Sequence, residues 1–313
     1  MPPPSNPPDS LPTSPYFHLE QLADGVWAAI VARGTGAWGN AGIVALGGRT
    51  LVFDTFLTPA AARDLRAAAD ALTGQPVAYV VNSHYHMDHI HGNAVFDDAT
   101  IITTGKTCER IANRGAEILA RMREHPDDLT SLDAEIASAA TPELANDLRV
   151  QQGDYRALYA ALPELALRLP DITFEQRLTL HGTARTVVVL SYGGGHTSSD
   201  AFLFLPAERI AFLGDLLGVR MHPSFGQADL EQWDEILERI EALNIQSVVP
   251  GHGPVGTLDD VAALRQYLGD MEMLVDEAIV RGETAERIVA LPPPGAYAAW
   301  DARTIYTENL RHL

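Results

Sequence analysis

Short runs of apolar residues separated by glycine occupy the first part of the chain, in the manner of β-strands joined by turns. The runs cover residues 25–31, 41–46 and 50–53. Apolar runs of this length, bounded by glycine, predict strands in consecutive hairpins. Thr58, followed by proline, then provides a helix start, and Gly74 provides its end. The beginning of the folded part is therefore a meander followed by a helix.

Further apolar runs continue the alternation of strands and helices through the chain. Strands are predicted at 77–81, 100–103, 172–174, 178–180, 186–190, 201–205, 209–213 and 247–250. Helices are predicted at 229–243, where apolar residues recur at helical spacing, and at 257–280, which Thr257 caps. This order is typical of an α/β protein.

Residues 105–170 differ from the rest because they contain no strand-like run. Helical segments are predicted around 107–124, 132–140, 142–150 and 155–169, with proline or Gly153 between them. This segment is an insertion in the α/β pattern. It either covers an active site, forms the contact of a homo-oligomer, or has no function of its own.

The two ends of the chain lack a strong pattern. Residues 1–15 contain seven prolines and predict an extended or disordered tail, so the folded domain is expected to be 16–313. After residue 280 an irregular segment rich in proline and aromatic residues is expected. The N-terminus has neither a basic nor an apolar signal region, and Cys108 is the only cysteine. These features favour a cytoplasmic protein without disulfides.

The net charge argues against nucleic acid as a partner, and the length of the apolar runs argues against a membrane. The net charge is −19, from 41 acidic and 22 basic residues, and no basic run offers a local exception. An acidic surface repels phosphate backbones, which argues against nucleic acid. No apolar run reaches the eighteen or so residues that a membrane helix needs, so no membrane is expected.

Metal-binding side chains are concentrated directly after the predicted strand 77–81. His84, His86, Asp88 and His89 fall within six residues. Imidazole and carboxylate groups are natural ligands of zinc and related divalent ions. The alternative is a surface loop that is rich in histidine by chance, but six of the eleven histidines lie within residues 82–93 or in the loops described next.

Three later loops repeat this arrangement. His196 follows strand 186–190 in a glycine-rich loop, Asp215 follows strand 209–213, and His252 follows strand 247–250 between two glycines. One histidine after a strand is usually structural, whereas four such loops indicate a common site. Glycine lets the backbone approach a crowded ion closely.

Together these residues form a pattern that resembles the metallo-β-lactamase superfamily. The chain has His-x-His-x-Asp-His at 84–89, then Gly-His-Thr at 195–197, Gly-Asp at 214–215 and Gly-His-Gly at 251–253. The resemblance covers about residues 17–280. It implies an αββα sandwich, in which two mixed β-sheets lie face to face with helices outside and the metals sit at one edge.

The resemblance also implies a ligand set. One metal ion would be held by His84, His86 and His196. The second would be held by Asp88, His89 and His252, with Asp215 bridging both. The cofactor would be two zinc ions, with iron or manganese as alternatives. In the hydrolases of this family a hydroxide shared by the ions is the nucleophile. Asp88 would be the catalytic residue that orients it and passes a proton.

Differences at single positions indicate which branches of the superfamily the chain resembles most. The true lactamases most similar at this motif have arginine at the position of His89 and a cysteine ligand that this chain lacks. Histidine at 89 is similar to glyoxalase-II-like, lactonase-like and broad-spectrum lactamase-like branches. Diiron electron-transfer members have glutamate at the position of His86, and the tRNA-processing branch would need a basic surface.

These residues predict a dinuclear zinc hydrolase that acts on a small carbonyl compound, namely a thioester, ester, lactone or β-lactam. The alternative is a mononuclear-iron sulfur (persulfide) dioxygenase of the same fold, in which two histidines and an aspartate suffice. A third interpretation, a scaffold or binding protein, is disfavoured because such proteins lose ligands and none is missing here.

Six further residues are candidates for contacts with the metal ligands or with the substrate. Asp54, at the end of a buried strand, would orient a ligand histidine, the alternative being a turn former. His91 would be a hydrogen-bond partner or pocket wall, and a structural role is favoured. The remaining four are Arg220 and His222, which could bind an anionic group, Tyr192, which could polarise a carbonyl, and Trp38, which could form an apolar lid.

Overall fold

Two β-sheets form the centre of the protein. The computed structural model describes residues 11–124 and 129–313, so most of the predicted N-terminal tail lies outside the described residues. The first sheet contains β1 (Phe17–Ala23), β2 (Val26–Val31), β3 (Ala41–Ala45), β4 (Thr50–Phe53), β5 (Val77–Val81), β6 (Thr100–Thr104) and β7 (Ile172–Phe174), side by side in that order. The second contains β8 (Arg177–His181), β9 (Thr186–Gly193), β10 (Asp200–Leu205), β11 (Ile210–Gly218) and β12 (Ser247–His252), again in order.

Both sheets are mixed. In the first, β1 to β4 form an antiparallel meander and β4 to β7 pair in parallel. In the second, β8 to β11 are antiparallel and β12 joins β11 in parallel. The parallel pairs are connected through helices, as chain geometry requires.

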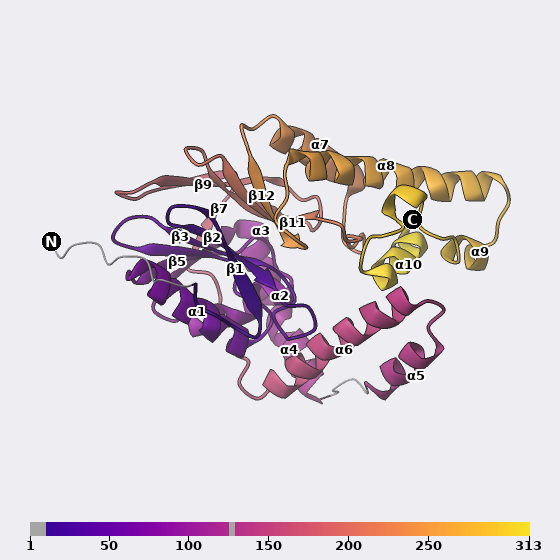
Figure 1. Cartoon of the computed structure of the whole chain (residues 1–313), viewed down its shortest axis with the longest axis horizontal. Coiled ribbons are helices and arrows are strands. Elements are labelled where there is room, and N and C mark those ends of the chain that lie inside the picture. Colours follow the sequence, from indigo (N-terminus) through magenta and orange to yellow (C-terminus); the bar gives the residue numbers. More distant parts are fainter. Residues whose placement is uncertain (1–10, 125–128) are drawn as a thin grey trace.

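Three hydrophobic layers hold the sheets and helices together. Phe53, Val189 and Phe212 belong to the layer between the two sheets. α1 (Pro59–Thr73) packs on the outer face of the first sheet through residues such as Leu65. α7 (Leu230–Glu241) and α8 (Leu258–Val280) cover the second sheet. Figure 1 shows the helices on opposite sides of the paired sheets, which confirms the predicted αββα sandwich.

Local capping explains where the long helices begin and end. The Thr58 hydroxyl accepts a hydrogen bond from the Ala61 amide, and α1 ends at Gly74, whose φ of 59° is left-handed. At α8, Thr257 and Asp260 form a capping box. The predicted limits of α8 are confirmed by the helix Leu258–Val280.

Helices fill the segment between β6 and β7. They are α3 (Gly105–Arg110), a π-helical turn η2 (Ile111–Gly115), α4 (Ala116–Glu124), α5 (Thr130–Ser138) and α6 (Pro142–Ala161). The predicted break at Gly153 is wrong, because α6 runs through it. A Cβ there would lie only 2.4 Å from the Gly34 carbonyl oxygen, so this glycine allows a close backbone contact.

The C-terminal segment is more ordered than its sequence pattern indicated. It contains α9 (Ala285–Val289), a 3-10 turn η3 (Gly295–Tyr297) and α10 (Arg303–His312). α10 faces α6 in Figure 1, and the Arg303 amide donates a hydrogen bond of 3.0 Å to Asp147 on α6. The prediction of an irregular tail is therefore wrong for residues 303–312. Across the described part of the chain, no helix is long and apolar enough to cross a membrane.

Candidate metal centre

The loop after β5 supplies four of the predicted ligands. His84 is the third residue after the strand, His86 is the N-cap of the short helix α2 (Met87–Ile90), and Asp88 and His89 lie within that helix. His84 and His89 are fully buried. A strand that ends in one turn of helix therefore turns these side chains toward the edge shared by both sheets.

The first group of converging side chains comes from this loop and from the second sheet. It comprises His84, His86, His196 and Asp215, whose ligand atoms all lie within 4.8 Å of one another. His196 Nε2 is 3.2 Å from His86 Nδ1 and 3.3 Å from Asp215 Oδ2. His84 Nε2 is 3.6 Å from the same carboxylate oxygen.

A second group lies beside the first. It comprises Asp88, His89 and His252, again with ligand atoms within 4.8 Å. His89 Nε2 is 3.2 Å from Asp88 Oδ2, and His252 Nε2 is 3.3 Å from that oxygen. The structure thus brings the seven predicted ligand side chains together in the two sets that the resemblance implied.

Asp215 joins the two groups because its carboxylate oxygens face different sets. Oδ2 lies near His84 and His196, whereas Oδ1 lies 3.1 Å from His89 Nε2 and 3.3 Å from His252 Nε2. A bulge in the pairing of β11 with β12, at Gly214 with φ of 54°, turns this residue toward the site. At position 251, any Cβ would overlap Asp215 Oδ1.

The spacing of these atoms fits metal ions. Ligands held 2.0–2.1 Å from a tetrahedral zinc ion lie roughly 3.3 Å apart. The separations of 3.1–3.6 Å match this value. His84 Nε2, His89 Nε2 and Asp215 Oδ1 are also buried without a hydrogen-bond partner. Buried polar atoms normally have partners, so these three atoms point to a cation between them.

Hydrogen bonds behind the ligands fix which imidazole nitrogen faces the site. His89 Nδ1 lies 2.8 Å from Asp54 Oδ2, and a carboxylate can only accept, so Nδ1 carries the proton. The Ser83 hydroxyl donates to Asp54 and can only accept from His84 Nδ1 at 2.9 Å. Each Nε2 is left with a free lone pair, as metal binding requires.

Burial and charge act differently on the histidines. Burial, together with the His196 imidazole, lowers the pKa of His86 to about 4, which keeps it neutral and able to bind metal. At His252, burial acts to lower the pKa, but the Asp215 and Asp88 carboxylates have the larger combined effect and raise the pKa to about 10. The carboxylates therefore favour positive charge at the second group.

One supporting residue of the His196 loop was missed by the sequence analysis. Asp200 is buried and accepts hydrogen bonds from the amides of Gly195 and Thr197 and from the Thr197 hydroxyl, at 2.8–2.9 Å. An aspartate that closes a glycine-rich loop four residues after a histidine is a signal that could have found it.

A cavity of about 900 Å³ opens over the metal-binding side chains. His86, Asp88, His196, Asp215 and His252 line its floor. Helices of the inserted segment and residues 301–305 line other parts of its wall. The insertion therefore forms part of the cavity wall, and its alternative role as the contact of a homo-oligomer stays a prediction.

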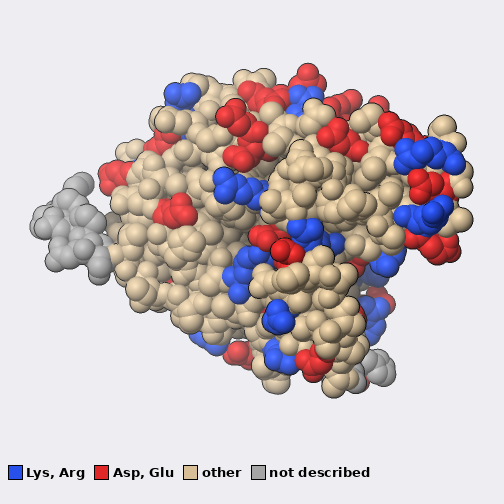
Figure 2. Space-filling model, turned by 45° about the vertical axis from the view of Figure 1, so that its right-hand side comes forward, with Lys and Arg blue, Asp and Glu red and all other residues tan. Residues whose placement is uncertain are grey.

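Charged side chains of both signs lie around this region. Arg33, Arg114, Arg121 and Arg220 line the cavity, as do several carboxylates. In Figure 2 acidic and basic side chains are interspersed, and among the described residues no extended basic area is visible on this face.

Three of the other candidate residues line the cavity. Trp38 does so, and its carbonyl oxygen lies 3.2 Å from His252 Nδ1. Arg220 is exposed, with φ of 57°. His222 is buried, with Nδ1 2.9 Å from the Tyr267 hydroxyl and Nε2 without a partner, and burial lowers its pKa to about 4.

Tyr192 and His91 do not line this cavity. Tyr192 packs against Phe202 and under the Arg239 guanidinium, which lies 3.6 Å from the ring centre, so the prediction that it reaches the pocket is wrong. Alternation along β9 turns its side chain toward α7 instead. His91 is buried behind α2, and burial lowers its pKa to about 4, in keeping with the favoured structural role.

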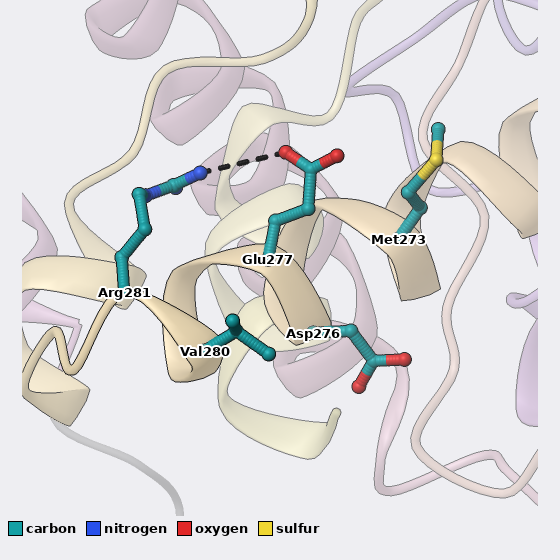
Figure 3. Close-up of a pocket in the computed structure, with 5 residues that line it drawn as sticks. All are labelled: Met273, Asp276, Glu277, Val280 and Arg281. Carbon is teal, nitrogen blue, oxygen red and sulfur yellow. Dashed lines mark hydrogen bonds and ion pairs between the residues drawn. The ribbon is translucent and has the colours of Figure 1, made fainter.

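A second, shallow depression lies on the outer face of α8 (Figure 3). Met273, Asp276 and Val280 line it together with the Glu277–Arg281 ion pair, whose atoms are 3.4 Å apart. Four of these residues belong to α8 and Arg281 is its C-cap, and none of the five carries an imidazole. The cavity over the histidines is therefore the candidate functional site.

The chain is similar to known proteins in sequence and in fold. Residues 35–252 match the model of the metallo-beta-lactamase superfamily. The type 2 metallo-beta-lactamase of Bacteroides fragilis is 30% identical over 110 residues, or 34% of this chain and 44% of that protein. The chain thus matches less than half the length of this curated relative.

Solved structures resemble most of the chain in fold, at lower sequence identity. A metallo-beta-lactamase from Pontibacter korlensis has a TM-score of 0.60 and 18% identity, covering 81% of this chain and 99% of its own. The structure titled TMB-1 has a TM-score of 0.59 and 16% identity, covering 83% and 100%. These similarities support the fold.

Proposed function

The chain belongs to the metallo-beta-lactamase superfamily, and from the arrangement of its site we propose that it is a hydrolase that uses two zinc ions. The observation that carries this proposal is the position of Asp215, whose two carboxylate oxygens face separate groups of ligand atoms. A single ion would not need a carboxylate divided in this way. Histidine-rich donor sets with carboxylates favour zinc, and iron or manganese are the alternatives.

The metal ions and Asp88 have different parts in the proposed hydrolysis. When bound, a pair of divalent ions lowers the pKa of a shared water toward neutrality and polarises a substrate carbonyl. Asp88 is partly exposed to the cavity and lies between His89 and His252. It would orient the attacking water and pass its proton to the leaving group.

The cavity supports a small-molecule substrate. Its volume of about 900 Å³ is within the range of roughly 300–1,000 Å³ common for ligand sites. Apolar side chains such as Ile118 and Val150 line its walls, and Arg220 and His222 lie among them. We assign Arg220 to a contact with a polar group of the substrate and Trp38 to the apolar wall, whereas His222, whose ring nitrogens are buried, supports the wall.

Hydrolysis of a substrate panel by zinc-loaded protein tests the proposal. The panel contains a thioester, an ester, a lactone and a β-lactam, and Asp215→Ala protein is the control. We expect turnover of at least one class, reduced in the variant at least about a hundredfold, because removing even an outer partner of a metal ligand costs about 10–100-fold. Zinc-loaded protein that hydrolyses none of them, or a fully active variant, would contradict the proposal.

A further inference from the structure

The loop between β2 and β3 lies between the inserted helix α6 and the metal-binding side chains. It contains Gly34, Gly36 and Gly39. On one side, a Cβ at Gly36 would lie 2.5 Å from Ala157 of α6. On the other side, a Cβ at Gly39 would lie 2.8 Å from His89 Cε1. The loop is therefore in close contact with both, and a shift of α6 would be transmitted to it.

Asp154 holds this loop against α6. Its Oδ1 accepts a hydrogen bond of 2.8 Å from the Gly36 amide, and its Oδ2 accepts one of 3.2 Å from the Gly34 amide. The side chain is buried, with the residue 2% exposed. A buried carboxylate is costly unless its oxygens are satisfied, so its two bonds select one loop conformation. Trp38 adds an edge-to-face contact with Tyr155, with ring centres 5.3 Å apart.

The far end of the loop touches the second group of ligands. The Trp38 carbonyl accepts from His252 Nδ1 at 3.2 Å. Asn40 donates through its side chain to the carbonyls of Pro250 and Gly253, and its amide donates to the Gly251 carbonyl. The loop therefore orients the His252 imidazole and the backbone that carries it. Contacts behind a ligand histidine fix its tautomer and direction.

We propose that Asp154 is a positioning residue for the metal centre, which acts through the Gly34–Gly36 backbone and the Trp38 carbonyl to orient His252. The inserted helix α6 thus sets the geometry of the position formed by Asp88, His89 and His252. The inference rests on the proposed two-metal function and assigns to the insertion a part in metal binding besides its contribution to the cavity wall.

Zinc titration of Asp154→Asn protein, with a competing chromophoric chelator, tests this inference. Asparagine keeps the shape but has one acceptor oxygen for two amides, so the Gly34 contact is lost. We expect the affinity for one of the two zinc equivalents to fall about tenfold, the lower end for an outer contact, and the other to change less than twofold. Glu135→Gln removes a charge from an exposed position on α5 of the same insertion and should leave both affinities unchanged.

A double-mutant cycle with His252→Ala separates positioning from general loosening. If Asp154 acts through His252, Asp154→Asn should change zinc affinity less than twofold in the His252→Ala background. An equal loss with and without His252, or unchanged affinities in Asp154→Asn itself, would overturn the inference. Wild-type protein that binds fewer than two zinc ions would overturn the proposed function and this inference with it.

Gly153→Ala provides a second variant that keeps the carboxylate. Its Cβ would press on the Gly34 carbonyl from the α6 side, while alanine favours the helix itself more than glycine does. We expect the same loss at one zinc equivalent, in protein whose circular dichroism matches the wild type. If this variant binds both zinc ions as tightly as the wild type, the loop does not transmit the position of α6 and the inference fails.

Discussion

His89 Nδ1 lies 2.8 Å from Asp54 Oδ2, and both residues are fully buried. Asp54 also accepts from the amide and the hydroxyl of Ser83, so three donors share its two oxygens. Burial raises the pKa of Asp54, and His89 and Ser83 act in the opposite direction. This carboxylate therefore links the end of β4 directly to His89 and, through the Ser83 hydroxyl, to His84.

Asp54→Asn should weaken metal binding without unfolding the protein. Asn tolerates the left-handed backbone at this position, where φ is 58°, but it offers one acceptor oxygen and no charge. We expect zinc affinity to fall about 10–100-fold, as measured by chelator competition. The same substitution at exposed Asp70 on α1 is the control. Wild-type affinity in Asp54→Asn would show that the contact does not orient His89.

Gly251→Ala should displace Asp215, because the added Cβ would overlap the Oδ1 that faces the second group. We expect a loss of zinc affinity of at least about tenfold, by analogy with other outer contacts. Gly269→Ala is the matched control. That residue is exposed on α8, with no atom within 4 Å of the added Cβ. It should bind zinc normally and gain about 0.5–1 kcal/mol in free energy of unfolding. Normal zinc binding by Gly251→Ala would be inconsistent with the assigned bridge.

Asn309→Ala tests the anchoring of α10. The buried Asn309 amide donates to the Pro223 carbonyl, at 2.7 Å, and accepts from the Phe225 amide, at 2.9 Å. The substitution leaves the Pro223 carbonyl and the Phe225 amide without a partner. This should lower the free energy of unfolding by roughly 2–4 kcal/mol, measured in urea. Glu308→Ala, on the exposed side of the same helix, should change it by less than about 0.5 kcal/mol. A similar effect for both variants would rule out a specific anchor.

The stability of the metal-free protein should depend on pH through Asp154. Burial raises the pKa of Asp154 to about 6, from the usual 3.8. The folded state then binds this proton more tightly than the unfolded state. The stability gained from protonation is complete below about pH 3.8 and is lost as the pH rises through 6.

Comparison of wild type with Asp154→Asn isolates this effect, since the nearby charges of Asp88 and His252 are common to both proteins. Between pH 4 and pH 7 the difference in free energy of unfolding should move in favour of the variant by roughly 3 kcal/mol. Urea titrations at several pH values measure it. A difference that is constant with pH, or that moves in favour of the wild type, would contradict the shifted pKa.

Local patterns explain what could be predicted from the sequence. Thr257 predicted the start of α8, and the apolar spacing of residues 229–243 predicted α7, because capping and amphipathicity are local. The metal-type side chains were found for the same reason, since strand ends followed by His or Asp are visible in short windows. Their convergence in the structure agrees with the expected grouping, and the ligand roles remain a prediction.

Long-range contacts explain what was missed. Asp154 and Gly36 are 118 residues apart, so no local pattern connects them, and Gly153 looked like a helix break because its contact with Gly34 was not visible. α10 begins at Arg303, and the preceding Ala302 provides no side-chain cap, so its stability comes from contacts such as that of Asn309 with Phe225. Tyr192 was misplaced because the outward face of β9 is decided by the packing of α7.

Metal content per chain, measured by elemental analysis on protein purified without a metal-binding tag, tests the two-metal site most directly. Wild-type and Asp215→Ala protein are compared after dialysis against a weak chelator. We expect about two zinc ions per wild-type chain and at most one in the variant, which lacks the carboxylate shared by both groups. About one iron per wild-type chain, or two zinc ions retained in the variant, would contradict the proposed dinuclear zinc hydrolase.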